Sequence, residues 1–138
     1  LVILAREIGW STQLADVNVE GLVPSALAAV SVSEFLERLA ELDGPIGARF
    51  EAARSKGHVL RYVARVDAQG EARVGLAELP GNHAFAHGRL TDNVVQFTTS
   101  RYRDNPLVVQ GPGAGPEVTA AGLFADLLRI ASGVGNSP

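Results

Sequence analysis

Cysteine is absent from this chain of 138 residues. Its absence excludes disulfide bonds, thiolate metal ligands and a cysteine nucleophile, and it is compatible with the cytoplasm. Long apolar runs are also absent, since none approaches the ~20 residues that a membrane-spanning helix needs. The first apolar run lacks a preceding basic segment and is interrupted by Arg6 and Glu7, which does not fit a secretory signal. We therefore expect a protein without a secretory signal or a membrane span. These absences do not fix its compartment, and the cytoplasmic location that we expect rests on other grounds.

Neither sign of charge dominates the chain, which carries 12 basic and 15 acidic residues for a net charge of −3. The two signs are interspersed, so no basic stripe is available for the phosphate backbone, and we expect no nucleic-acid partner. With 46% hydrophobic residues, the chain has enough apolar side chains for one core. One compact domain is the expectation.

The first residues show apolar spacing typical of a helix, with Leu1, Leu4, Ala5 and Ile8 on one face and Gly9 as the stop. No capping residue and no initiator methionine precede this pattern. We therefore expect the helix to begin upstream of the first residue and the chain to be part of a longer protein.

The next segment predicts one strand and two helices. Apolar and polar residues alternate over 16–23, which favours a strand. Ser31 and Glu34 fit a capping box and predict the start of a helix. Pro45 at a first helical position predicts a second helix, which Gly57 closes.

The second half of the chain is rich in predicted strands. Alternation over 59–66 and again from Ala72 to Leu76 predicts an antiparallel hairpin, and further strands are expected at 93–99 and 107–110. These strands are mostly not separated by helices. The pattern favours an α+β fold, with a mixed or largely antiparallel sheet and helices packed on it.

A glycine-rich turn follows the last predicted strand. Gly111, Gly113 and Gly115 alternate with other residues, so the backbone is free to adopt positive φ and to be approached closely by a ligand. Pro116 removes an N–H donor and Glu117 adds a carboxylate, which both disfavour a phosphate here. The alternative is that the glycines serve packing alone.

The predicted helix after this turn begins at Pro116. It is expected to pack through an apolar stripe made of Val118, Ala121, Phe124, Leu127 and Leu128.

The spacing of the glycines differs from the dinucleotide fingerprint, and no second strand with a ribose-binding acid follows. A complete nucleotide-binding fold is therefore not expected in this chain.

Other constellations give little support for chemistry. His83 and His87 have the spacing of two metal ligands on a helix, but neighbouring glycines disfavour a helix there and no third ligand is evident. No serine lies in a Gly-x-Ser-x-Gly elbow. We predict neither a metal site nor a catalytic residue in this chain.

Five blocks of the chain resemble consecutive blocks of the homoserine dehydrogenase family, most closely the form fused to an aspartate kinase. The blocks are LVILARE at 1–7, VLRYV at 59–63, DN at 92–93, NPLVVQGPGAG at 105–115 and VTAAGLFAD at 118–126. The last two are the most specific. The resemblance implies an oxidoreductase that interconverts L-homoserine and L-aspartate 4-semialdehyde with NAD or NADP in threonine and methionine biosynthesis.

The resemblance also implies roles for parts of this chain. It makes 1–110 a partial substrate and dimerisation region, with the hairpin 59–79 and the strand 93–99 as candidates for pairing two subunits into a homodimer. It makes 111–138 a cofactor-facing turn and C-terminal helix. The cofactor-facing residue is most directly Gly115, with Gly113 and Ala114 as neighbours.

By the same resemblance, the dinucleotide domain and the catalytic lysines precede Leu1. The cofactor is then bound mainly by that absent part, and the fragment alone is expected to be inactive, because it supplies one edge of the site. The sequence leaves open the choice between NAD and NADP and whether a kinase is fused. The alternative is a non-catalytic α+β module that binds a metabolite or mediates dimerisation.

Overall fold

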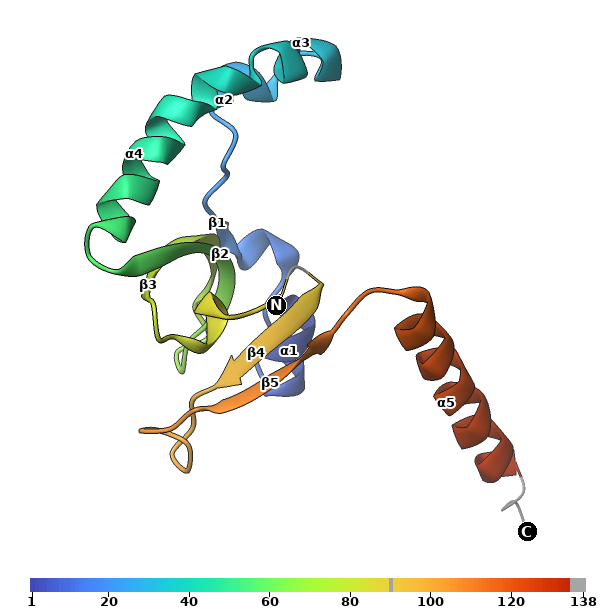
Figure 1. Cartoon of the computed structure of the whole chain (residues 1–138). Coiled ribbons are helices and arrows are strands. Elements are labelled where there is room, and N and C mark those ends of the chain that lie inside the picture. Colours follow the sequence, from blue (N-terminus) through green and yellow to red (C-terminus); the bar gives the residue numbers. More distant parts are fainter. Residues whose placement is uncertain (90, 135–138) are drawn as a thin grey trace. The chain divides into compact units, whose positions relative to one another are not determined.

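The computed structural model describes residues 1–89 and 91–134 and divides the chain into two compact units, Leu1–Ala86 and His87–Pro138 (Figure 1). We call them unit 1 and unit 2. Helices occur with a three-stranded sheet in unit 1 and a two-stranded sheet in unit 2. The predicted α+β class with mixed and antiparallel pairing is confirmed.

Unit 1 begins with helix α1, Val2–Glu7. The helix ends where the sequence predicts, because Gly9 adopts a φ of 102° and the N–H of Trp10 donates to the Ala5 carbonyl. The Trp10 ring then lies over Gly70, where an added Cβ would be 3.0 Å from Trp10 Cε3. Trp10 thus joins the end of α1 to the turn of the hairpin described next.

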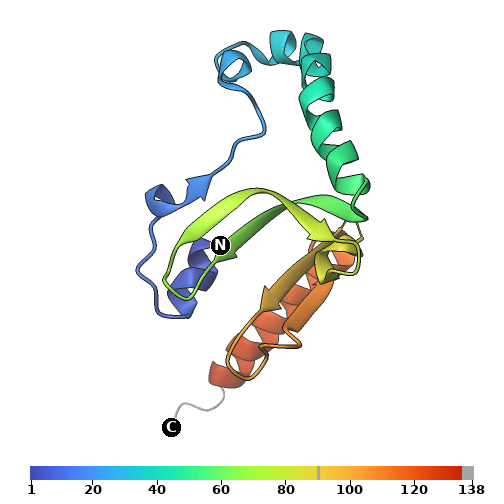
Figure 2. The ribbon, with the colours of Figure 1, turned by 90° about the vertical axis from the view of Figure 1, so that its left-hand side faces the viewer.

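The hairpin of unit 1 consists of β2, His58–Val66, and β3, Ala72–Pro80, paired antiparallel from His58 opposite Pro80 to Val66 opposite Ala72 (Figure 2). The turn between them is organised by Asp67, whose Oδ1 accepts from the N–H groups of Gln69 and Glu71. The predicted hairpin and its turn are confirmed.

The strand predicted over 16–23 is mostly wrong. A 3₁₀ turn, η1, covers Leu14–Asp16, and the strand β1 is limited to Asn18–Val19, parallel to β3. Asp16 is unavailable to a strand because its Oδ2 accepts from the Gln13 N–H, 2.8 Å away. Alternation alone does not reveal this local hydrogen bond.

Glu20 continues β1 and connects three elements. Its N–H donates to the Val74 carbonyl, and its carbonyl accepts from the Tyr62 hydroxyl, 2.9 Å away. Its carboxylate accepts from Arg49 Nη1 at 2.8 Å, which lowers the pKa of Glu20. Glu20 therefore ties β1 to both hairpin strands and to the helix that carries Arg49.

That helix is the last of a helical segment made of α2 (Ser25–Ala28), α3 (Val32–Glu37), η2 (Leu39–Leu42) and α4 (Asp43–Arg54). The predicted cap is confirmed, since Ser31 Oγ accepts from the Glu34 N–H at 3.2 Å. The predicted start of the second helix at Pro45 is wrong by two residues. Helix α4 begins at Asp43, because Asp43 and Gly44 already adopt helical geometry. Gly57, with a φ of 71°, follows the helix as predicted.

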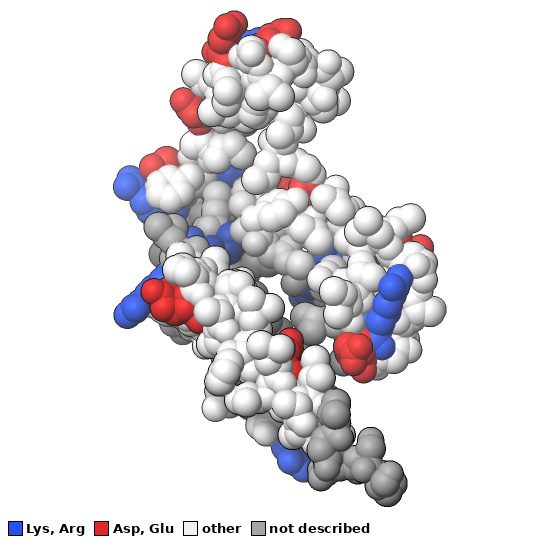
Figure 3. All heavy atoms as spheres, turned by 90° about the vertical axis from the view of Figure 1, so that its right-hand side faces the viewer, with Lys and Arg blue, Asp and Glu red and all other residues white. Residues whose placement is uncertain are grey.

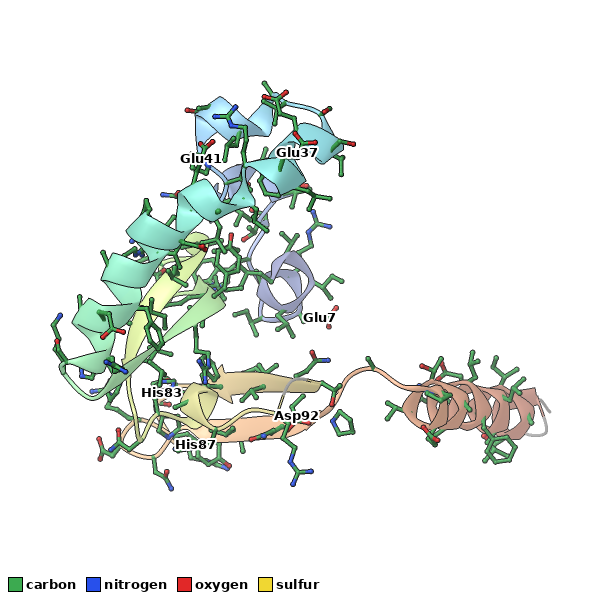
Figure 4. All side chains as sticks on the ribbon, turned by 45° about the horizontal axis from the view of Figure 1, so that its top comes forward. Glu7, Glu37, Glu41, His83, His87 and Asp92 are labelled. Carbon is green, nitrogen blue, oxygen red and sulfur yellow. The ribbon has the colours of Figure 1, made fainter. Side chains whose placement is uncertain are left out.

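The helical segment exposes charge on its outer surface. Arg38 donates to Glu41 at 2.7 Å and to Glu34 at 3.1 Å, and all three side chains are exposed. Figure 3 shows acidic side chains on the outside of this segment at the top of the view, and Figure 4 labels Glu37 and Glu41 there. These charges form a solvated surface, as is usual for such runs.

Unit 2 contains β4, Asp92–Phe97, and β5, Leu107–Pro112, paired antiparallel from Asp92 opposite Pro112 to Phe97 opposite Leu107. Helix α5, Pro116–Val134, follows. Both predicted strands are present. β4 begins one residue earlier and ends two residues earlier than predicted, and β5 is longer than predicted at its carboxyl end. Among the described residues, no helix is long and apolar enough to cross a membrane.

Helix α5 does not pack as the sequence predicts. Its large apolar side chains are 40% to 65% exposed: Val118, Leu123, Phe124, Leu127, Leu128 and Ile130. They occupy most of the circumference of the helix, a pattern typical of a helix that is covered on several sides. The predicted packing is wrong for this chain because the described residues supply no apolar layer against these side chains.

Two leucines allow a matched test of the difference in burial between unit 1 and helix α5. Leu27 in α2 is 4% exposed and Leu127 in α5 is 64% exposed. Leu27→Ala should lower the free energy of unfolding of the 138-residue chain by about 2 kcal/mol or more, because it empties a buried volume. Leu127→Ala should change it by no more than about 0.5 kcal/mol. Urea unfolding of both variants checks this, and equal losses would contradict the assigned burial.

Glu78 on β3 gives a prediction of pH dependence. Its carboxylate lies 2.7 Å from His58 Nδ1 and 3.1 Å from Lys56 Nζ, and hydrogen bonding to His58 and then to Lys56 lowers the pKa of Glu78. A carboxyl whose pKa is lower in the folded chain stabilises at neutral pH, and this stabilisation is lost as the pH falls through the lowered pKa.

Glu78→Gln should therefore flatten the acid side of the curve of unfolding free energy against pH. The measurement is urea unfolding at a series of pH values, with Glu37→Gln on the exposed surface of α3 as the control. Identical acid limbs for the unmodified chain and Glu78→Gln would argue against this ion pair in solution.

Candidate functional site

The candidate site is the glycine segment between β5 and α5. The structure places Gly111 and Pro112 inside β5, so the turn begins at Gly113 and is shorter than predicted. Among the three alternating glycines, positive φ occurs at Gly115, with a value of 132°. Gly111 and Gly113 do not use the freedom to adopt positive φ, and β5 remains extended through Pro112.

A side chain at position 113 is disfavoured by steric overlap. A Cβ added at this position would overlap the side-chain amide of Asn93. Asn93 is the second residue of β4 and pairs with Gly111 on β5. Since residues two apart on a strand share a face, the amide of Asn93 lies along the face that Gly111 and Gly113 leave open. At this position the packing interpretation of the glycines holds.

Gly115 differs from Gly113, because the space beside it is open. The nearest atom to a Cβ built there is Glu117 Oε2, at 3.9 Å. Its positive φ nevertheless disfavours any residue with a side chain. Gly115 thus presents bare backbone to open space directly before α5.

The start of α5 is unsuited to a phosphate. Pro116 has no N–H, and the Gly115 carbonyl accepts from both the N–H and the Oγ1 of Thr119, at 3.1 and 2.9 Å. The Glu117 carboxylate stands in the first turn, where it would repel an anion at close range. These features of the start of α5 agree with the sequence argument against a phosphate at this turn.

The opposite face of the strand pair also holds the glycine segment. Asp92 Oδ2 accepts from Gln110 Nε2 at 2.8 Å and from the Arg89 N–H at 3.4 Å. The N–H of Gly113 donates to the Thr91 carbonyl at 2.9 Å. Figure 4 labels Asp92 at the start of β4, beside β5. The backbone of Gly113 is therefore tied to Thr91, directly before β4, and the Asp92–Gln110 hydrogen bond joins β4 to β5 on the face opposite Asn93.

The three candidate cofactor residues, Gly113, Ala114 and Gly115, are consecutive between β5 and α5. Their contact with a cofactor stays a prediction. Sequence reasoning noted Asp92 and Asn93 only as a block of resemblance and missed their place beside this turn. The pairing of β4 with β5 was the missing information, because register decides which residues meet.

Among the described residues, His83 and His87 do not form a metal site. His83 precedes η3, a 3₁₀ turn at Ala84–Ala86, so the helical spacing that would align it with His87 is absent. Its Nδ1 accepts from the Phe85 N–H at 3.2 Å, and its ring packs edge-on against Phe85. Among residues 1–89 and 91–134, no group of three or more His, Cys, Asp or Glu side chains is arranged to hold a metal.

Arg61 fixes the segment that contains η3. Its guanidinium donates to the carbonyls of Phe85 and Ala86, both at 2.9 Å, and to its neighbour Leu60. The arginine spans from β2 to η3 and satisfies two carbonyls of an irregular segment. Its role in unit 1 is structural.

Comparison with known proteins identifies a family. The family model for homoserine dehydrogenase matches residues 1–128. The chain is 46% identical over 137 residues to bifunctional aspartokinase/homoserine dehydrogenase 2, chloroplastic, of Arabidopsis thaliana, which covers 98% of this chain and 15% of that protein. It is 47% identical over 131 residues to bifunctional aspartokinase/homoserine dehydrogenase 2 of Escherichia coli, covering 95% of this chain and 16% of that protein.

Shorter relatives match as well. The homoserine dehydrogenase of Emericella nidulans is 42% identical over 137 residues, covering 94% of this chain and 37% of that protein. A crystal structure of a Candida auris protein of unknown function is similar with a TM-score of 0.86 and 42% identity, over 95% of this chain and 37% of that chain. This chain thus spans 15% to 37% of the length of these relatives.

Proposed function

We propose, since the chain belongs to the homoserine dehydrogenase family, that it is the C-terminal segment of an enzyme that interconverts L-homoserine and L-aspartate 4-semialdehyde. The electron carrier would be NAD or NADP, and the reaction would serve threonine and methionine biosynthesis. The family match over residues 1–128 and the identities of 42% to 47% support this proposal.

Within that enzyme, this chain would supply one wall of the cofactor site. The observation that carries this assignment is the bare backbone of Gly115, which has a φ of 132° and open space on the side where a Cβ would stand. A flat ring can approach such backbone closely. The Glu117 carboxylate nearby favours the cationic ring of an oxidised nicotinamide over a phosphate.

The chemistry needs more than this wall. Hydride transfer requires cofactor and substrate to be held in a reactive geometry beside a group that moves a proton. The glycine segment offers backbone, and three side chains near it are engaged in hydrogen bonds: Gln110 with Asp92, and Thr119 with the Gly115 carbonyl. We therefore propose that the 138-residue chain alone is inactive and that catalytic groups and most cofactor contacts lie in the rest of the enzyme.

We also propose that the rest of the enzyme covers α5. Six large apolar side chains of this helix are at least 40% exposed in the described chain. Leaving such a surface in water is unfavourable by about 25 cal/mol per Å² of apolar area, so a partner surface is expected.

Subunit pairing is a further part of the proposal. In unit 1 the strand order is β1-β3-β2, so β2 forms an edge of its sheet, and in unit 2 the sheet consists of β4 and β5. Edge strands offer backbone groups to another chain unless they are protected. We propose a homodimer through such strands, in a cytoplasmic enzyme. The name of the Arabidopsis thaliana relative describes that protein as chloroplastic.

The proposal is tested by assaying the protein encoded by the complete gene. Homoserine-dependent reduction of NAD and NADP is expected from that protein and not from the 138-residue chain, because the chain holds one wall of the site. The ratio of the two rates gives the cofactor preference. A folded, dimeric full-length protein with no activity toward either cofactor would favour the alternative, a non-catalytic metabolite-binding or dimerisation module.

Gly115→Val in the full-length enzyme tests the cofactor wall. We expect a raised Michaelis constant for the cofactor and reduced turnover, since the side chain would fill the open space and strain a backbone with a φ of 132°. Gly57→Val is the control, because Gly57 also has positive φ and open space but lies in unit 1, before β2. An unchanged cofactor Michaelis constant and turnover in Gly115→Val would refute this role.

A further inference from the structure

The side chain of Asn93, a residue of β4, lies against the glycine segment that follows β5. We propose that Asn93 is a positioning residue, which holds the backbone of 113–115 in the shape that faces the cofactor. The inference rests on the proposed function and deepens it, because it names what keeps the wall in place.

The first argument is steric. The side-chain amide of Asn93 fills the volume in which a Cβ on Gly113 would stand. The Asn93 amide therefore packs against Gly113, and a side chain at position 113 would require this amide to shift. By contrast, a Cβ at Gly111 would meet nothing within 4 Å, although Gly111 is the residue that pairs with Asn93.

The second argument is that Asn93 completes a set of constraints on both ends of the turn. Gly113 is held by its hydrogen bond to the Thr91 carbonyl, and Gly115 is held by Thr119. The Asp92 carboxylate binds Gln110 on the other face of the strand pair. Asn93 is the side chain that reaches the turn itself on the Gly113 face.

The third argument concerns chemistry. In the proposed site, the Glu117 carboxylate and the bare backbone at Gly115 contact the cofactor only if the turn keeps its conformation. Hydride transfer is sensitive to small misplacements of the cofactor ring, so a shift of the turn would weaken it. Asn93 does not itself face the open space at Gly115. Its removal should therefore weaken cofactor binding through the turn, with little effect on the binding of homoserine.

The experiment uses the full-length enzyme and Asn93→Ala. The dissociation constant of the reduced cofactor is measured by titration of its fluorescence, and the Michaelis constants of cofactor and homoserine are measured separately. We expect the cofactor constants to rise about tenfold, as small displacements at a site commonly cause, and the homoserine constant to stay within about twofold. Thermal unfolding reports whether the variant is folded.

A pair of variants tests the steric contact independently of activity. Gly113→Ala should lower the unfolding temperature of the enzyme, because its methyl group overlaps the Asn93 amide, which must then shift. The double variant with Asn93→Ala should regain stability, since the methyl group then takes the place of the amide. Gly111→Ala is the matched control for stability and should lower the unfolding temperature less than Gly113→Ala does.

The outcomes separate this inference from the proposed function. An active parent enzyme whose Asn93→Ala variant binds cofactor as tightly as the parent overturns the positioning role and leaves the proposed function intact. A Gly113→Ala variant that Asn93→Ala does not rescue overturns the steric contact. A folded parent enzyme that binds neither NAD nor NADP overturns the proposed function and, with it, this role.

Discussion

Antiparallel strand pairing is the constraint on which the rest of this structure depends. The described chain buries few apolar side chains deeply, among them Ala5, Leu27, Ala53 and Ala72. The pairing of β2 with β3 organises unit 1, because Trp10, Glu20 and Arg61 each tie another segment to this hairpin. In unit 2 the pairing of β4 with β5 sets which residues meet the glycine segment. Two-stranded ribbons are marginal in water by themselves, so these ladders need further packing.

The glycine segment shows that a glycine-rich motif can combine two physical requirements. Gly113 is required by a neighbouring side chain, whereas Gly115 is required by its own backbone conformation and faces open space. A motif that is uniform in sequence thus divides into a position that serves packing and a position with positive φ and open space beside it. The Glu117 carboxylate lies near the second position, with its Oε2 3.9 Å from where a Cβ on Gly115 would stand.

Family membership and the exposed apolar surface of α5 both support the proposal that this chain is a segment of a longer enzyme. The chain matches the homoserine dehydrogenase family over residues 1–128 and spans 15% to 37% of the length of its relatives. Helix α5 carries apolar side chains on most of its surface, and the described residues leave them exposed. Such a helix is stable when other parts of a protein cover it, because tertiary packing and not propensity supplies most helical stability.

The sequence by itself determined features that depend on near neighbours: the Ser31 cap, the positive φ of Gly9 and Gly57, and the hairpin of β2 and β3. It failed where a local pattern competes with other contacts, as over 16–23, where Asp16 closes a turn, and in α5, whose predicted partner is not supplied. Only the tertiary structure revealed that Asn93 occupies the side-chain position of Gly113. That contact joins residues on different strands, and strand register, which no local pattern specifies, decides it.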